Sequence, residues 1–322
     1  MIKFIMVDLN LLRGIIIMYE NINITLLGGD RRQIYAVKCL ANTCSKLNVC
    51  GTSADLLSLI CKNVMGNIFC AESAEDAIKE SRVIILPVPA SSDGVHVSAP
   101  LDSTGALSEL KLSSIVRLCD KDTVVIGGKL PEAFVNAAIE KGLKVHDLLD
   151  FECFEIANAY TTAEAALSIA LNSLTVNLKD ARVAVTGFGR ISKHLCRLLS
   201  LLGARVTVAA RKQRDLAWAE TLGYQAVHIN KDGWSDPLTN GYNIIYNTVP
   251  SVIFDRDFLN KVNRDTLLVE LASVPGGFDI CAARELGANI SWALSLPGKY
   301  APESAGAIIA EGVVKILGEV AL

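Results

Sequence analysis

The chain has 322 residues, of which 51% are hydrophobic and only 6% aromatic, and its formal net charge at pH 7 is −3. This length is sufficient for two domains, and an excess of aliphatic over aromatic residues is typical of α/β proteins. A charge so close to neutral gives no reason to expect nucleic acid or an anionic membrane as a partner. No uninterrupted apolar run approaches the roughly 18 residues of a membrane span, so we expect no membrane association.

The nine cysteines are an odd number, are scattered along the chain and form no C-x-x-C pair. This usage favours reduced, mostly buried thiols and a cytoplasmic protein. No group of histidine, cysteine and carboxylate residues has metal-ligand spacing, so we expect no metal site.

The first 18 residues are apolar but are interrupted by Lys3, Asp8, Asn10 and Arg13. They lack the continuous core and the small-residue cleavage site of a signal peptide. We expect residues 1–18 to be an extension outside the folded core, with Met18 as the natural start. An additional strand or a partner-binding helix is the alternative.

Strands and helices alternate through the first half of the chain. Apolar runs predict strands at 21–27, 48–51, 67–70, 82–88, 123–127 and 144–146, with helices at 54–62, 74–79 and 131–141 between them. This alternation predicts a parallel, doubly wound sheet. The first strand ends in Gly28-Gly29-Asp30, which lacks the G-x-G-x-x-G spacing. We therefore expect a flavodoxin-like domain without a nucleotide over residues 19–152, completed by a C-terminal helix at 303–322.

A long helical pattern at 153–176 predicts a crossover into a second domain, residues 153–302. That domain opens with the sequence ARVAVTGFGRISKHLCRLLSLLGARVTVAARK at 181–212. A buried strand, a glycine turn, an amphipathic helix and a second strand follow one another here, which is the context that a dinucleotide-binding turn requires. Further strands are predicted at 225–229, 243–247, 267–271 and 289–294. The fold class is therefore α/β, with a C-terminal Rossmann NAD(P)-binding domain.

The glycine turn predicts where a nucleotide binds. Gly187 permits the tight turn, Gly189 lets a pyrophosphate approach the backbone, and the small Ser192 stands at the third motif position. The N–H groups at the start of the helix then bind phosphate. The predicted cofactor-binding residues in the turn and in the loops after the fourth and fifth strands are Gly187, Phe188, Gly189, Arg190, Ile191, Asn247, Thr248, Val249, Pro250 and Ser273.

The residues after the second strand of this domain predict the type of cofactor. An NAD site carries an acidic residue there, which binds the ribose hydroxyls. This chain instead has Arg211 and Lys212, with Arg214 close behind. Cations at this position favour the 2′-phosphate of NADP, so we expect NADP as the cofactor.

Four residues are candidates for contact with the substrate. Ser91 and Ser92 follow the strand at 82–88, Thr162 lies on the crossover helix, and Lys299 lies in the Pro/Gly-rich loop at 296–302. Hydroxyl groups and a cation at these places are suitable for binding a ligand. Of the four histidines, only His146 is expected near a ligand-binding edge, and the pattern does not identify a proton acceptor.

From about residue 23 to its C-terminus, the chain resembles the A subunits of bacterial dipicolinate synthase. The matching motifs are Gly28-Gly29-Asp30-Arg31-Arg32-Gln33, Leu86-Pro87-Val88-Pro89, Thr162-Ala163-Glu164, Gly187-Phe188-Gly189-Arg190, Asn247-Thr248-Val249-Pro250, Leu271-Ala272-Ser273, Pro275-Gly276-Gly277, Leu296-Pro297-Gly298-Lys299 and Ala301-Pro302. The order and combination of these motifs are specific to the family, although the chain departs from its pattern at Ser192 and at Ala165-Ala166.

The resemblance implies an enzyme that oxidises dihydrodipicolinate, a diaminopimelate-pathway intermediate, to dipicolinate with NADP. It also implies a flavoprotein-like B subunit as partner, a homo-oligomer, and action in the mother-cell cytoplasm during sporulation. Two alternatives remain from the residues alone. One is a 2-hydroxyacid or amino-acid dehydrogenase, and the other is a non-catalytic NADP-binding regulatory protein.

Overall fold

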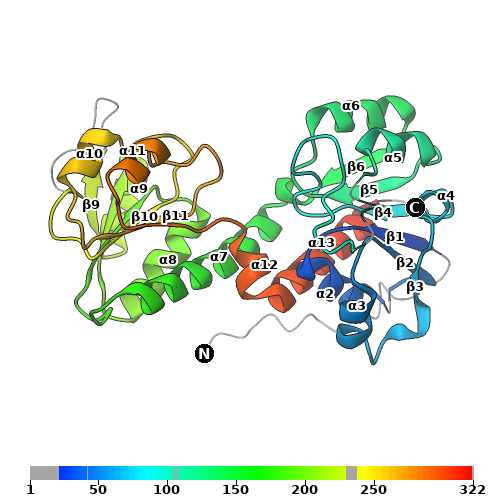
Figure 1. Ribbon diagram of the computed structural model, residues 1–322, viewed down its shortest axis with the longest axis horizontal. Helices are drawn as coiled ribbons and strands as arrows, with labels where there is room; N and C mark the ends of the chain where they lie inside the picture. The colour runs from blue at the N-terminus through cyan, green and yellow to red at the C-terminus, as the bar shows by residue number, and fades with distance from the viewer. Residues whose placement is uncertain are drawn as a thin grey trace. The chain divides into compact units, whose positions relative to one another are not determined.

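The computed structural model describes residues 22–320, apart from positions 42, 104, 106, 108 and 230–237. The predicted extension at residues 1–18 lies outside the described residues. The described chain divides into two compact units, one formed by residues 22–155 and 302–320 and the other by residues 156–301. Each unit contains one six-stranded sheet (Figure 1).

The first unit is built around a parallel sheet with the strand order β3-β2-β1-β4-β5-β6. Its strands are β1 (Asn23–Leu27), β2 (Lys46–Cys50), β3 (Ile68–Cys70), β4 (Val83–Ile85), β5 (Val124–Gly127) and β6 (Lys144–Asp147). Its helices are α2 (Arg31–Leu40), α3 (Ala54–Ile60), α4 (Ala74–Lys79), α5 (Leu112–Leu118), α6 (Glu132–Lys141) and α13 (Pro302–Glu319), with short 3-10 turns at Met65–Asn67 and Leu148–Asp150.

Alternate residues of these strands enter two cores on opposite faces of the sheet. In β4, for example, Val83 and Ile85 pack on the face covered by α2, α3 and α13, whereas Ile84 packs on the face covered by α4, α5 and α6. Helix α13 packs so closely on α2 that a Cβ atom at Gly306 would lie only 2.5 Å from the carbonyl oxygen of Arg32. A segment from the end of the chain therefore completes the core of the first unit.

The second unit repeats this topology, with the strand order β9-β8-β7-β10-β11-β12. Helix α7 (Glu152–Ser173) leads into it from the first unit. Its strands are β7 (Arg182–Thr186), β8 (Arg205–Ala210), β9 (Gln225–His228), β10 (Ile244–Asn247), β11 (Leu267–Glu270) and β12 (Ile290–Trp292). Its other helices are α8 (Arg190–Leu201), α9 (Gln213–Thr221), α10 (Arg256–Lys261), α11 (Ile280–Glu285) and α12 (Leu296–Tyr300).

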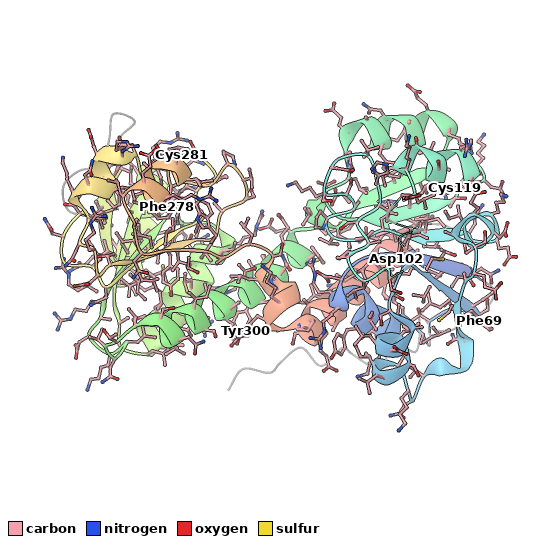
Figure 2. All side chains as sticks on the ribbon, viewed as in Figure 1. Phe69, Asp102, Cys119, Phe278, Cys281 and Tyr300 are labelled. Atoms are coloured by element: carbon pink, nitrogen blue, oxygen red, sulfur yellow. The ribbon has the colours of Figure 1, made fainter. Side chains whose placement is uncertain are left out.

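This sheet also has a core on each face. Helices α7, α8 and α9 cover one core, and α10 and α11 cover the other. In the second core the ring of Phe278, labelled in Figure 2, stacks on that of Phe254 with centroids 4.3 Å apart. Helices on both faces leave the carboxyl ends of the strands as the edge at which loops gather.

The prediction of an α/β fold with two parallel, doubly wound sheets is confirmed, and each predicted strand is present. The flavodoxin-like description of the N-terminal sheet is wrong in one respect. A flavodoxin-like sheet has the order 2-1-3-4-5, whereas this sheet has the order 3-2-1-4-5-6 of a Rossmann fold. The reason is that β3 pairs with β2 at the outer edge before the chain crosses to β4 on the other side of β1.

Candidate functional site

The glycine turn between β7 and α8 leaves space for a ligand. Gly187 has a φ of +78°, and a Cβ atom there would lie 2.9 Å from the hydroxyl oxygen of Thr248. A Cβ atom at Gly189 would meet no heavy atom within 4 Å. Gly189 is the N-cap of α8, and no side chain caps this helix. The start of α8 therefore offers its amide N–H groups to an anion, as phosphate-binding helices do.

Hydroxyl groups join this turn to the neighbouring strand. The Thr248 hydroxyl donates to the carbonyl oxygen of Thr186 at 2.6 Å and also lies 2.8 Å from the Ser192 hydroxyl. Ser192 is fully buried. The serine at the third motif position is therefore small enough to pack beneath the turn and also links α8 to the loop after β10.

The chain after β8 carries exposed cations. Arg211 and Lys212 are both exposed, and Arg214 forms a 3.5 Å ion pair with Asp215. The imidazole Nε2 of His228, at the end of β9, lies 3.1 Å from the carbonyl oxygen of Arg211. In a Rossmann fold this turn is where the adenosine ribose and any 2′-phosphate bind.

The other predicted cofactor-binding residues differ in how far they are exposed to a ligand. Phe188 is buried in the core, where its ring meets that of Tyr224 edge-on. Ser273 and Pro250 are exposed in the loops after β11 and β10. Asn247 is fully buried and ties those loops to the strands, because its amide group donates to the carbonyl oxygen of Val249 and its oxygen accepts from the Thr186 hydroxyl.

The equivalent edge of the first unit is already occupied by the chain itself. The Asp30 carboxylate caps α2 by accepting from the Arg32 amide at 3.0 Å. The Gly29 amide donates to the carbonyl oxygen of Ser98, and a Cβ atom at Gly51 would clash with the side chain of Leu107. Ser98 and Leu107 therefore lie against the turns after β1 and β2, where a nucleotide binds in a Rossmann crevice, which leaves the second unit as the nucleotide-binding candidate.

That same segment holds a histidine–carboxylate pair that the sequence pattern did not predict. His96 Nδ1 lies 2.7 Å from Asp93 Oδ2, while Asp93 Oδ1 accepts from the amides of Val95 and His96. Hydrogen bonds from His96, Val95 and Ser91 hold the pKa of Asp93 well below its usual range. Because an ionised carboxylate only accepts, His96 Nδ1 carries the proton, and in the neutral form of the imidazole Nε2 presents a lone pair.

The four predicted substrate residues are divided between the two units. The first unit contains Ser91 and Ser92, and the second contains Thr162 and Lys299. Ser91 donates to Asp93 Oδ1 at 2.9 Å and so supports the histidine pair, and Ser92 is exposed beside it. Thr162 is buried in α7 and donates to the carbonyl oxygen of Asn158 in the preceding turn. Lys299 is exposed on α12, so the segment at 296–302, predicted as a loop, contains one short helix.

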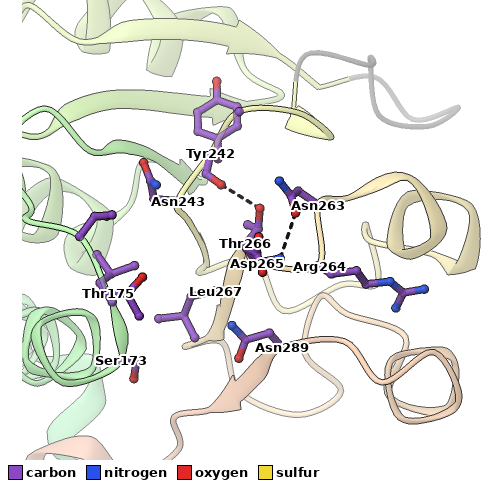
Figure 3. Close-up of a pocket in the computed structure, with 13 residues that line it drawn as sticks. Ser173, Thr175, Tyr242, Asn243, Asn263, Arg264, Asp265, Thr266, Leu267 and Asn289 are labelled. Carbon is purple, nitrogen blue, oxygen red and sulfur yellow. Dashed lines mark hydrogen bonds between the residues drawn. The ribbon is translucent and has the colours of Figure 1, made fainter.

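A hollow of about 490 Å³ lies at the opposite edge of the second sheet (Figure 3). Its lining includes Asn243, Thr266 and Asn289, each of which immediately precedes the start of a strand. The Thr266 hydroxyl donates to the carbonyl oxygen of Tyr242 at 2.8 Å, so one polar group that lines the hollow is already hydrogen-bonded within the protein. Since parallel sheets bind ligands at the carboxyl ends of their strands, we assign no ligand to this hollow.

Membrane-spanning helices and metal clusters are both absent from the part of the chain that the structure describes. Within it, no helix is both long and apolar enough to cross a membrane. Among the same residues, no three histidine, cysteine or carboxylate side chains are grouped as a metal site would require.

Comparison with known proteins agrees with the expected resemblance. Residues 23–149 match the family model that describes the N-terminal domain of the dipicolinate synthase A subunit. The A subunit of dipicolinate synthase from Bacillus subtilis (strain 168) is 28% identical over 304 residues, which cover 94% of this chain and 98% of the relative.

Solved structures extend this agreement to the fold. The dipicolinate synthase A subunit from Bacillus subtilis superposes with a TM-score of 0.79 at 27% identity, covering 93% of this chain and 96% of that one. Its counterpart from Bacillus halodurans gives a TM-score of 0.80 at 24% identity, covering 92% and 98%. An L-alanine dehydrogenase shares the fold alone, with a TM-score of 0.57 at 11% identity, covering 91% and 88%. The chain therefore shares the fold of these proteins, is similar to dipicolinate synthase A subunits over nearly its whole length, and matches the N-terminal domain of that subunit at residues 23–149.

Proposed function

We propose that this chain is the A subunit of a dipicolinate synthase, an NADP-dependent oxidoreductase that converts dihydrodipicolinate to dipicolinate together with a B subunit. The observation that carries the proposal is the contrast between its two carboxyl edges. The start of α8 is uncapped and open at Gly189, whereas the equivalent start of α2 is capped by Asp30. A nucleotide site in the second unit supports a dinucleotide cofactor, and the resemblance to dipicolinate synthase A subunits supports this reaction over the alternatives.

The residues of the second unit fit a nicotinamide dinucleotide. The amides at the start of α8 suit the pyrophosphate, and Arg211 and Lys212 suit a 2′-phosphate. When bound, the nicotinamide supplies a hydride acceptor. Formation of the aromatic ring removes one hydride and one proton from the substrate, so the reaction also needs a proton acceptor.

His96 is the proton acceptor in this proposal. The 2.7 Å contact with Asp93 places the proton of the neutral imidazole on Nδ1, so Nε2 is the atom that would take a proton from a ring carbon of the substrate. In this proposal the Ser91 hydroxyl orients the Asp93 carboxylate through its hydrogen bond and does not contact the substrate. The exposed Lys299 remains the proposed counter-ion for a substrate carboxylate, and Ser92 and Thr162 remain proposed contacts.

The direct test is turnover of dihydrodipicolinate by the purified chain with NADP⁺, alone and mixed with the B subunit. We expect NADPH and dipicolinate to form in equal amounts. Turnover by the chain alone would place the chemistry in this protein. Binding of NADP⁺ without turnover in either mixture would instead support the regulatory alternative, and oxidation of a 2-hydroxy or amino acid would support the other dehydrogenase alternative.

Arg211→Ala is expected to raise the dissociation constant for NADPH by about 10- to 100-fold, since a charged hydrogen bond contributes about 1.5–3 kcal/mol. Binding of NADH should barely change, because NADH lacks the 2′-phosphate. The matched control is Arg205→Ala, at the other end of the same strand, where the exposed arginine pairs with Asp180. Titrations with both reduced cofactors measure the effect, and an equal loss for NADH and NADPH would contradict NADP selectivity.

A further inference from the structure

A fully buried carboxylate ends β11. Oε1 of Glu270 accepts from the Asn247 amide group at 2.6 Å and from the Ala272 amide at 2.9 Å. Oε2 accepts from the amides of Gly277 at 2.7 Å and Phe278 at 3.3 Å. All four donors are neutral N–H groups, which match an ionised carboxylate because that group only accepts.

This carboxylate has no cationic partner among the described residues. The ion pairs of the second unit, such as Arg205 with Asp180 and Arg256 with Glu285, involve other side chains at the surface. Burial of a charge is costly unless dipoles or a counter-ion compensate it. Here only the four N–H dipoles compensate the charge of Glu270, so a net negative charge remains buried at the carboxyl edge of the sheet. Because the protein interior screens charge less than water does, the electric field of this carboxylate acts strongly on groups bound nearby.

The Glu270 carboxylate also fixes the loops around it. Its hydrogen bonds to Ala272 and Gly277 close the turn after β11, and Asn247 extends the network to the Thr186 hydroxyl. Gly277 must be a glycine, because a Cβ atom there would clash with the Asn247 side chain. The network therefore joins the carboxyl ends of β7, β10 and β11.

The position of the Glu270 network in the sheet predicts which half of a dinucleotide lies next to it. A dinucleotide crosses the sheet at the point where the strand order reverses, here between β7 and β10. The cations at Arg211 and Lys212 follow β8, so the adenosine half belongs on the β7–β9 side. The nicotinamide half then belongs on the β10–β12 side, above the loops that Glu270 holds.

We propose that Glu270 is a positioning residue whose buried charge makes the site favour the oxidised nicotinamide over the reduced one. The oxidised ring carries one positive charge and the reduced ring carries none, so a fixed negative charge beneath it discriminates between the two forms. This inference rests on the proposed function, since it requires a nicotinamide cofactor. It adds a preference for the form that an oxidising enzyme must bind first.

The test measures dissociation constants of NADP⁺ and NADPH for the full-length wild type, Glu270→Gln and Glu270→Asp. In Glu270→Gln the affinity for NADP⁺ should fall about tenfold relative to that for NADPH, because one unit charge is lost. Glu270→Asp keeps the charge and should keep the wild-type ratio, even if both affinities fall. The matched control is Glu285→Gln, which removes an exposed carboxylate of the same unit and should leave the ratio unchanged.

An equal loss of both affinities in Glu270→Gln would overturn the electrostatic role and leave a structural one. If that variant does not fold, the wild type alone decides. It should bind NADP⁺ at least as tightly as NADPH, and tenfold tighter binding of NADPH would refute the proposal. A wild type that binds neither form would instead refute the proposed function, so the two failures are distinguishable.

Discussion

Replacing His96 with glutamine is expected to lower kcat for the oxidation of dihydrodipicolinate by about 10²- to 10⁴-fold, the usual contribution of a positioned general base. Glutamine can still donate to Asp93 but offers no nitrogen lone pair to a proton. The dissociation constant for NADPH should not change, because His96 lies in the first unit and the nucleotide residues lie in the second. Steady-state kinetics and a separate cofactor titration measure the two quantities.

Two further variants define the outcome. Asp93→Asn should lower kcat by a smaller factor, because asparagine can offer Nδ1 a donor and no longer fixes the imidazole tautomer. His146→Gln tests the histidine that the sequence predicts near a ligand-binding edge, and its kcat should stay at the wild-type value. Wild-type kcat in His96→Gln would exclude His96 as the proton acceptor, and an equal loss in His146→Gln would show that the effect is not specific to His96.

The two sheets and the glycine turn could be predicted because their signals are local. The burial of β7 follows from its apolar run, and the turn after it needs glycine at a φ of +78° whatever the rest of the chain does. The cations after β8 are likewise placed by the end of a strand. Each of these features depends on fewer than about ten neighbouring residues, which is the range that sequence patterns report.

The strand order of the first unit could not be predicted in the same way. The pattern predicted a strand at 67–70 but not the partner with which it pairs. Pairing of β3 with the outer edge of β2 depends on where the chain crosses the sheet, and apolar periodicity carries no such information.

The histidine pair could not be predicted because its geometry arises in an irregular loop. Asp93 and His96 are three residues apart, but their contact depends on a turn held by hydrogen bonds from Ser98 to Ala90 and from Val97 to Leu110. Glu270 was not predicted for a related reason. An acidic residue at the end of an apolar strand is usually solvated, and only the folded loops show that four N–H groups bind this one in the interior.

Gly189→Val is expected to raise the dissociation constant for NADPH at least about 100-fold, or about 2.7 kcal/mol, while the protein stays folded. A Cβ atom at this position meets no heavy atom within 4 Å, and the φ of −86° suits any residue. The valine side chain therefore enters only the volume that a pyrophosphate needs. Replacing the N-cap residue should cost about 1 kcal/mol, which is a fall of a few degrees in Tm.

Gly66→Val is the matched control, because a Cβ atom at Gly66 also meets nothing within 4 Å and this residue lies in the first unit. It should leave both Tm and cofactor affinity unchanged. Gly187→Ala provides the contrast, since the positive φ and the nearby Thr248 hydroxyl should make it lose stability as well as binding. Wild-type NADPH affinity in Gly189→Val would show that no pyrophosphate approaches this turn, and a Tm lower by more than about 10 °C would show that Gly189 serves the fold instead.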